Sequence, residues 1–153
     1  MAQDIERQFQ EKVCRKIYLK TEGIHRFRVF TPFSFEDGDN LGIILRRENS
    51  HWILTDEGHT FMHLSYDMDE HDLQRGTRAR IISNVVSMYG VEERAGELVL
   101  KIEDDNFGDA LYSFVQALLK ITDVSYLSRE RVRSTFMEDL RHFLGRCWRP
   151  DAR

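Results

Sequence analysis

The segment spanning residues 38–64 constrains the fold of this chain more than any other. Its sequence, GDNLGIILRRENSHWILTDEGHTFMHL, contains two short runs of strand-forming residues separated by a polar turn at residues 48–50. The second run ends abruptly in the letters TDEG, after which the apolar spacing becomes helical. We therefore predict an antiparallel hairpin over residues 41–55, followed directly by a helix that Thr55 or Asp56 caps.

The rest of the chain predicts one α+β domain over residues 1–145 and a basic tail over residues 146–153. Helical and strand-forming patterns alternate, with no internal repeat or linker between them. We expect a small antiparallel sheet with the 41–55 hairpin central, covered by several helices. Further strands are expected at residues 25–35, 91–93 and 97–102, and further helices at residues 2–19, 77–89, 107–121 and 128–144. Thr77 and Ser128 are the expected caps of the helices that they begin.

The two terminal helices are expected to carry broad apolar stripes. In the first helix an apolar residue recurs every four positions, at Ile5, Phe9, Val13 and Ile17. In the last helix the residues expected to face the core are Val132, Phe136, Leu140 and Phe143. These stripes offer more apolar surface than one face of a small sheet can cover. A two-fold homodimer through the C-terminal helices and packing of the helices on each other are both open explanations.

Composition argues against several classes of function. The chain has 22 basic and 26 acidic residues, whereas a dedicated nucleic-acid binder usually shows a basic excess. No apolar run approaches the ~20 residues that span a bilayer, so we expect no membrane association. The sequence shows no signal-peptide pattern. We therefore expect a cytoplasmic protein in which Cys14 and Cys147 are reduced.

Four acidic residues lie in the turns on either side of the hairpin: Asp37, Asp39, Asp56 and Glu57. Carboxylates from two neighbouring turns can hold Mg²⁺, and would then support a metal-dependent hydrolase or nuclease. We favour the alternative in which these side chains cap a helix and stabilise turns. From the sequence we accordingly assign no catalytic residue, no bound metal and no cofactor.

Two histidines stand four residues apart on the helix expected after Gly58. His59 and His63 point to one side of that helix, a spacing that can bind Zn²⁺. Thr60 occupies the place where a metalloprotease would carry its glutamate. His71 is a third candidate ligand in an acidic loop. We favour an exposed polar helix face over a metal site.

Arginines crowd the start of two expected helices, and aromatic residues are plentiful. The arginines can grip phosphates or an acidic protein, or form a solvated face with local ion pairs, which we favour. Aromatic residues, Met and Arg are enriched at protein interfaces. The residues expected at a binding surface are Trp52, Arg75, Arg78, Arg80, Arg129, Arg133 and Phe136.

The order of several short motifs is that of a known family. The motifs are TPF at residues 31–33 with Phe35, DGD at 37–39, LTDEG at 54–58 with Leu64, YGV at 89–91 and GEL at 96–98. Over about the first four-fifths of its length the chain resembles the DUF1828 family, small uncharacterised proteins of bacteria and phages. The resemblance implies a compact α+β domain and brings no catalytic residues with it.

The function that these observations favour is a non-enzymatic protein-binding module. The resemblance implies a setting in a phage or other mobile element, with defence or counter-defence as the process served. Two alternatives stay open: a metal-dependent hydrolase or nuclease using the acidic turn cluster, and a nucleic-acid-binding protein using the arginine clusters. The expected partner is a protein, with a second copy of the chain as one candidate.

Overall fold

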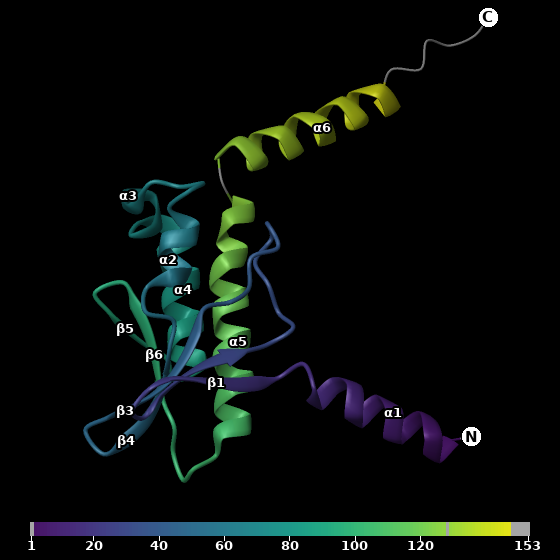
Figure 1. Ribbon diagram of the computed structural model, residues 1–153. Helices are drawn as coiled ribbons and strands as arrows, with labels where there is room; N and C mark the ends of the chain where they lie inside the picture. Colours follow the sequence, from purple (N-terminus) through teal and green to yellow (C-terminus); the bar gives the residue numbers. More distant parts are fainter. Residues whose placement is uncertain (1, 128, 148–153) are drawn as a thin grey trace, which may run out of the picture.

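The computed structural model describes the backbone of residues 2–127 and 129–147, and within these ranges the side chains of residues 3–127 and 133–146. In the described residues one open sheet of six antiparallel strands has the order β1-β2-β3-β4-β6-β5. The strands are β1 (Tyr18–Gly23), β2 (Arg26–Phe30), β3 (Ile43–Glu48), β4 (His51–Thr55), β5 (Glu92–Arg94) and β6 (Glu97–Lys101). The hairpin β3–β4 occupies the middle of this sheet, as predicted, and the α+β class is confirmed (Figure 1).

Helices cover one face of the sheet and form the core with it. They are α2 (His59–Leu64), α3 (Glu70–Leu73), α4 (Gly76–Met88) and α5 (Phe107–Thr122), followed by the 3-10 turn η1 (Asp123–Leu127). Phe114, Leu118 and Ile121 of α5 are completely buried, and α5 contacts β4 and β6. Burial of these large side chains provides the main driving force for packing this layer on the sheet.

The other face of the sheet is polar, yet three aliphatic residues are buried in it. Ile44, Ile53 and Val99 are at most 3% exposed although they lie outside the main core cluster. Their cross-strand neighbours are mostly charged: Arg28 pairs with Ile44, and Arg46 pairs with Ile53. We attribute the burial to the aliphatic stems of these arginines, which can cover apolar surface while the charged ends stay in water.

The N-terminal prediction was partly wrong. Helix α1 covers Ala2–Cys14, and the expected end of the helix is instead strand β1, which pairs with β2. Tyr18 stacks on Phe30 with ring centroids 4.7 Å apart. Ile17 continues the four-residue spacing by coincidence, and cross-strand pairing overrides the local helical pattern.

The C-terminal prediction was also wrong in one respect. Helix α6 (Arg129–Cys147) leaves the domain, so Phe136 and Phe143 are 61% and 63% exposed rather than in the core. The helix also continues through Gly145, where we expected it to end. The side chain of Val132 and the expected cap Ser128 lie outside the described residues.

Helix starts and connectors differ from the sequence prediction in smaller ways. Helix α4 begins at Gly76 with Arg75 in the capping position and no side-chain cap, so Thr77 lies inside the first turn. The acidic connector after α2 contains the short helix α3. Gly90 follows the C-cap residue Tyr89 of α4 and has a φ of +63°, the left-handed conformation that commonly ends helices. Among the described residues, no helix is both long and apolar enough to cross a membrane.

Candidate functional site

Asp56 is the structural centre of the turn between β4 and α2. It is 3% exposed, and its Oδ1 accepts hydrogen bonds from the backbone N–H groups of Gly58 and Leu98, at 3.0 and 2.8 Å. Its Oδ2 accepts a third from the N–H of Thr60 at 3.0 Å. The prediction that Thr55 or Asp56 occupies the cap was wrong in position, because Gly58 is the N-cap residue and has no side-chain cap. Asp56 instead accepts a hydrogen bond from the first turn of α2 and ties this helix to strand β6. Both oxygens are used inside the fold.

Glu57 turns away from Asp56 and joins a network on the polar face of the sheet. Its carboxylate accepts two hydrogen bonds from Arg26, at 2.5 and 2.9 Å, and lies 3.4 Å from Arg46. Hydrogen bonding by Arg26 lowers the pKa of Glu57, against the opposing effect of partial burial. Arg46 continues the network to Glu97, which accepts a hydrogen bond from Thr55.

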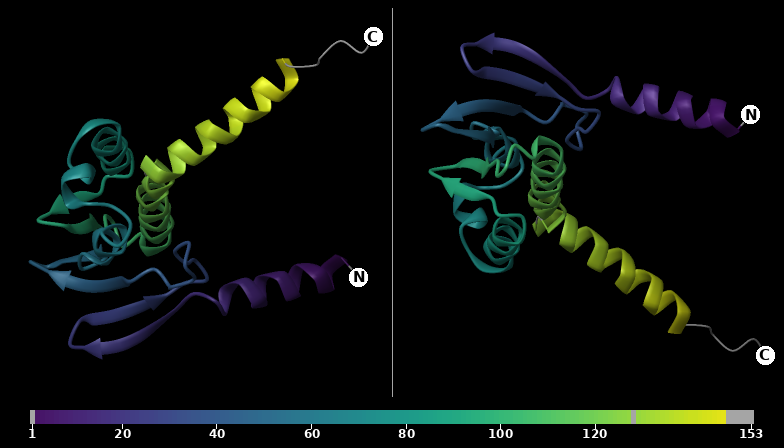
Figure 2. Two further views of the ribbon diagram at one scale, coloured as in Figure 1. Left: turned by 90° about the horizontal axis from the view of Figure 1, so that it is seen from above. Right: turned by 90° about the horizontal axis from the view of Figure 1, so that it is seen from below.

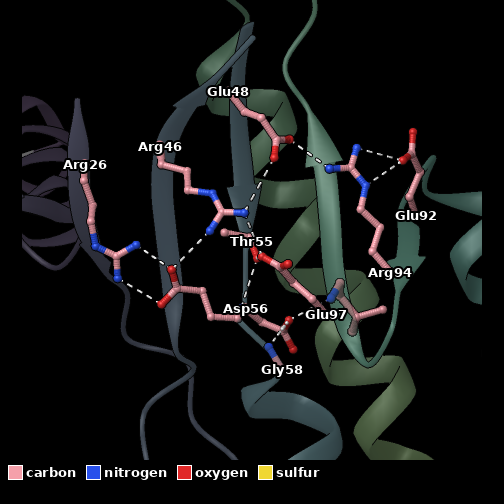
Figure 3. A network of polar contacts seen from close by, with 11 residues as sticks. Arg26, Arg46, Glu48, Thr55, Asp56, Gly58, Glu92, Arg94 and Glu97 are labelled. Atoms are coloured by element: carbon pink, nitrogen blue, oxygen red, sulfur yellow. Dashed lines mark hydrogen bonds and ion pairs between the residues drawn. The ribbon is translucent and has the colours of Figure 1, made fainter. Parts of the chain in front are cut away.

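The network extends across all six strands of the sheet, because Arg26 also lies 3.9 Å from Glu22 of β1. Figure 3 shows Arg46 between Glu48 and Glu97, and Arg94 between Glu48 and Glu92. Most of its side chains are between a quarter and two-fifths exposed, so the ion pairs are screened by solvent. Positive and negative groups alternate, and most of the charges are paired within the network, with four glutamates besides Glu22 against three arginines.

Asp37, Asp39 and His63 form a second cluster, where the loop before β3 meets α2. The Nε2 atom of His63 lies 3.1 Å from Oδ2 of Asp37 and 3.7 Å from Oδ2 of Asp39. This nitrogen is buried and is not aligned for a hydrogen bond to either carboxylate. One ligand atom from each of the three residues lies within 4.8 Å of the other two, an arrangement that can hold a metal ion.

The loop between β2 and β3 places the two carboxylates of this cluster. The N–H of Phe35 donates to the carbonyl of Asp39 at 2.7 Å, and the N–H of Asp39 donates to Oδ1 of Asp37 at 3.0 Å. Gly38 has a φ of +92°, which glycine adopts without strain. The ring of Phe35 stacks on His63 with centroids 4.0 Å apart and fixes the imidazole. Sequence reasoning missed this stacking contact.

The structure thus separates the candidate metal ligands into two groups that lie apart. Asp37, Asp39 and His63 come together, whereas Asp56 and Glu57 are engaged elsewhere. His59 lies beside the cluster, its ring centroid 6.0 Å from that of His63. The interpretation of the histidine pair as an exposed helix face was wrong, because both rings are partly buried and His63 is only 12% exposed. His59 and His63 are partly buried because the helix that holds them, α2, packs against α5.

A cavity of about 440 Å³ opens next to this cluster. Asp37 and His63 form part of its wall, and Glu36, Asp67 and Asp123 add further carboxyl groups. The apolar part of the wall comes from Phe35, Leu64 and Leu119. The carboxyl groups favour a cationic occupant over an anionic one.

The residues predicted for a binding surface lie in three different environments. Trp52 is half-buried, with the rings of Phe27 and Phe107 about 6 Å away, and belongs to the edge of the core. Arg78 donates a hydrogen bond to the carbonyl of Leu127 and joins α4 to η1. The others that the structure describes are exposed: Arg75, Arg80, Arg133 and Phe136. The side chain of Arg129 lies outside the described residues.

Helices α1 and α6 carry eight of the large apolar side chains that are exposed in the described residues. Both helices leave the domain toward the same side (Figure 2). The exposed apolar residues of α1 are Ile5, Phe9 and Val13, and those of α6 are Phe136, Met137, Leu140, Phe143 and Leu144. Two helices with unpaired apolar stripes are the feature that monomeric soluble proteins rarely show.

The fold is a two-layer α+β domain, with helices on one face of an open sheet and an ion-pair network on the other. The chain belongs to the DUF1828 family, because a model described as a domain of unknown function matches residues 31–121, more than half of its length. The match includes both acidic turns and ends within α5. It leaves out α1, β1, β2 and α6. Comparison with curated proteins gave no match, and comparison with solved structures gave none.

Proposed function

We propose that this protein is a non-enzymatic protein-binding module that first binds a second copy of itself. The observation that carries the proposal is the exposure of eight apolar side chains on α1 and α6, each between 37% and 69% exposed. Association would remove this surface from water, at a gain of about 25 cal/mol for each Å² buried. A two-fold dimer in which α6 of each copy packs against α1 of the other would cover both stripes of both copies.

The charges of the two helices support a second copy as the occupant. Helix α1 carries three acidic and two basic residues, whereas α6 carries five arginines and three acidic residues. Helix α1 of one copy can therefore lie against α6 of its partner with charges of opposite sign facing each other. Because both helices leave the same side of the domain, one two-fold axis can bring both pairs together (Figure 2).

Sedimentation of the purified chain tests the dimer. We expect a species of about twice 18.2 kDa at micromolar concentration. The double variant Phe136→Glu with Phe143→Glu is expected to sediment as a folded monomer, because these side chains are exposed in the single copy. Glu138→Gln, on the opposite side of the same helix, is the matched control and should still dimerise. A single 18.2 kDa species of the unmodified protein at high micromolar concentration overturns the proposal.

The setting we propose for this binding activity is a phage or other mobile element, in defence or counter-defence. The support is the family resemblance alone. Affinity purification from the native host tests it, with the double glutamate variant as the control bait. A host protein retained by the unmodified chain and lost with the variant supports the proposal. Equal retention by both baits contradicts a role for α6.

The two alternative functions have less support from the geometry. The hydrolase hypothesis needs a convergent set of acids, and Asp56 and Glu57 are both engaged in structural contacts. The nucleic-acid hypothesis needs clustered free arginines, and Arg78 binds a carbonyl within the fold, which leaves Arg75, Arg80 and Arg133 exposed. An electrophoretic mobility shift of nucleic acid that weakens steeply with salt would support the nucleic-acid-binding alternative.

A further inference from the structure

We infer that Asp37, Asp39 and His63 form a binding site for one divalent transition-metal ion, for which Zn²⁺ is the best probe. This inference is independent of the proposed dimer, because the cluster lies on the loop before β3 and on α2 and includes no residue of α1 or α6. It concerns the part of the chain that the family shares, since all three residues lie within the matched range.

The two distances from His63 to the carboxylates are those of a metal site, and all three ligand atoms lie within 4.8 Å of one another. Metal–ligand bonds of about 2.0–2.2 Å at tetrahedral angles place neighbouring ligand atoms about 3.4 Å apart. The Nε2 atom of His63 lies 3.1 and 3.7 Å from the two carboxylate oxygens, on either side of that value. The structure therefore needs only small side-chain adjustments to coordinate an ion.

The unsatisfied state of His63 is a second observation that points to a ligand. Its Nε2 atom is buried and has no hydrogen bond, and a buried polar atom without a partner is costly. Stacking on Phe35 holds the ring with this nitrogen toward Asp37 and Asp39. A metal ion between the three side chains would give the nitrogen a partner and neutralise two carboxylates that lie close together.

The donor set selects the class of ion. Two carboxylates and one imidazole suit Zn²⁺ and similar first-row ions, whereas Mg²⁺ and Ca²⁺ prefer oxygen ligands alone. Three protein ligands leave coordination positions open, as in zinc sites that keep a bound water. Asp37 and His63 also form part of the wall of the 440 Å³ cavity, so a small ligand there can reach the ion.

The turn at residues 37–39 tolerates conservative tests. The side chains of Asp37 and Asp39 are 52% and 75% exposed, so their asparagine variants should fold. Asn in place of Asp37 keeps an oxygen that can accept the N–H of residue 39. His71→Gln is the matched control, because it removes an exposed imidazole outside the cluster.

The experiment is titration of the full chain, purified in chelator and dialysed, with Zn²⁺ by calorimetry. We expect one equivalent per chain and a higher thermal midpoint in the presence of zinc. Asp39→Asn and His63→Gln should weaken binding by more than about tenfold, since loss of even an outer-shell group costs 10–100-fold. His71→Gln should bind like the unmodified chain. In Co²⁺-loaded protein, the visible absorption bands should disappear with Asp39→Asn.

Three results would overturn the inference. The first is no zinc binding above background, which would leave His63 and the two carboxylates as a simple ion pair. The second is equal binding by the Asp39→Asn and His63→Gln variants, which would place the ion elsewhere. The third is half an equivalent per chain, which would mean that the ion bridges two copies. Circular dichroism of each variant confirms that it is folded.

Discussion

At the scale of single residues, Asp56 shows how one carboxylate can organise a turn. Three backbone N–H groups from two elements converge on its oxygens, and two of these hydrogen bonds are fully buried. Without the carboxylate, these donors would lose their partners in a region that water cannot reach. A buried donor without a partner costs about 1–3 kcal/mol.

We predict that Asp56→Ala lowers the free energy of unfolding by about 3–5 kcal/mol. Asp56→Asn should cost less, because its amide keeps one oxygen acceptor but offers an N–H₂ group to a second donor. Urea denaturation measures both values. Asp67→Ala, at an exposed position, serves as the control and should change the stability by less than about 0.5 kcal/mol. Equal effects at the two positions would contradict the role of Asp56.

Glu57 gives a prediction with a pH dependence. Arg26 lowers the pKa of its carboxyl group in the folded protein from 4.5, so folding favours the ionised form. The stability that Glu57 contributes is present above pH 4.5 and is lost as the pH falls through the lowered pKa. Urea denaturation should show Glu57→Gln to be less stable by about 1 kcal/mol or less at neutral pH, because the pair is partly exposed. The difference should shrink in acid, and a constant difference would argue against the ion pair.

At the scale of elements, the loop before β3 and helix α2 pack closely at Gly42. A β-carbon at this position would lie 2.9 Å from Nδ1 of His59 and 3.0 Å from its Cγ. The imidazole cannot easily move away, because its other neighbours include the ring of Phe35, with centroids 5.6 Å apart. Glycine is therefore required here by close contact rather than by backbone conformation.

Gly42→Ala should destabilise the protein by about 1–3 kcal/mol, the usual cost of overpacking a filled site. Gly108→Ala is the matched control in the first turn of α5, where an added β-carbon meets no atom within 4 Å. That control should be neutral or stabilising by up to about 1 kcal/mol, because alanine favours helix. Thermal unfolding of the two variants compares them directly, and similar midpoints would contradict the close contact.

At the scale of the whole molecule, the folded domain is larger than the range that the family match covers. Strand β2 pairs with β3 and buries Val29 in the core cluster, although β2 precedes residue 31. Val124 lies beyond residue 121 and is 1% exposed. Terminal helices α1 and α6, in contrast, extend away from the domain (Figure 1).

We predict that residues 15–127 alone fold as a stable monomer, whereas residues 31–121 alone do not. The shorter piece loses β1 and β2, so β3 becomes an unprotected edge strand with exposed aliphatic residues, which favours aggregation. Sedimentation and the dispersion of amide NMR signals measure the outcome for both pieces. A dimeric 15–127 piece would contradict the proposal that association requires α1 and α6.

The sequence by itself determined the central hairpin, the polar turn at Asp56 and the class of fold. These features depend on local signals: alternating apolar residues, a turn composition and a change of period within a few residues. The motifs that pointed to the family lie within residues 31–98, and the match of the family model to residues 31–121 confirms the family. The amphipathic stripes of the first and last helices were also visible in the sequence, but the sequence did not show whether they are buried or exposed.

Tertiary structure alone decided where those stripes and the candidate metal ligands lie. The pairing of β1 with β2 converted the expected end of a helix into a strand, because cross-strand contacts outweigh local helical spacing. The exposure of Phe136 follows from the direction in which α6 leaves η1. Asp39 and His63 are 24 residues apart in the sequence, and only the packing of the loop before β3 on α2 brings their side chains together.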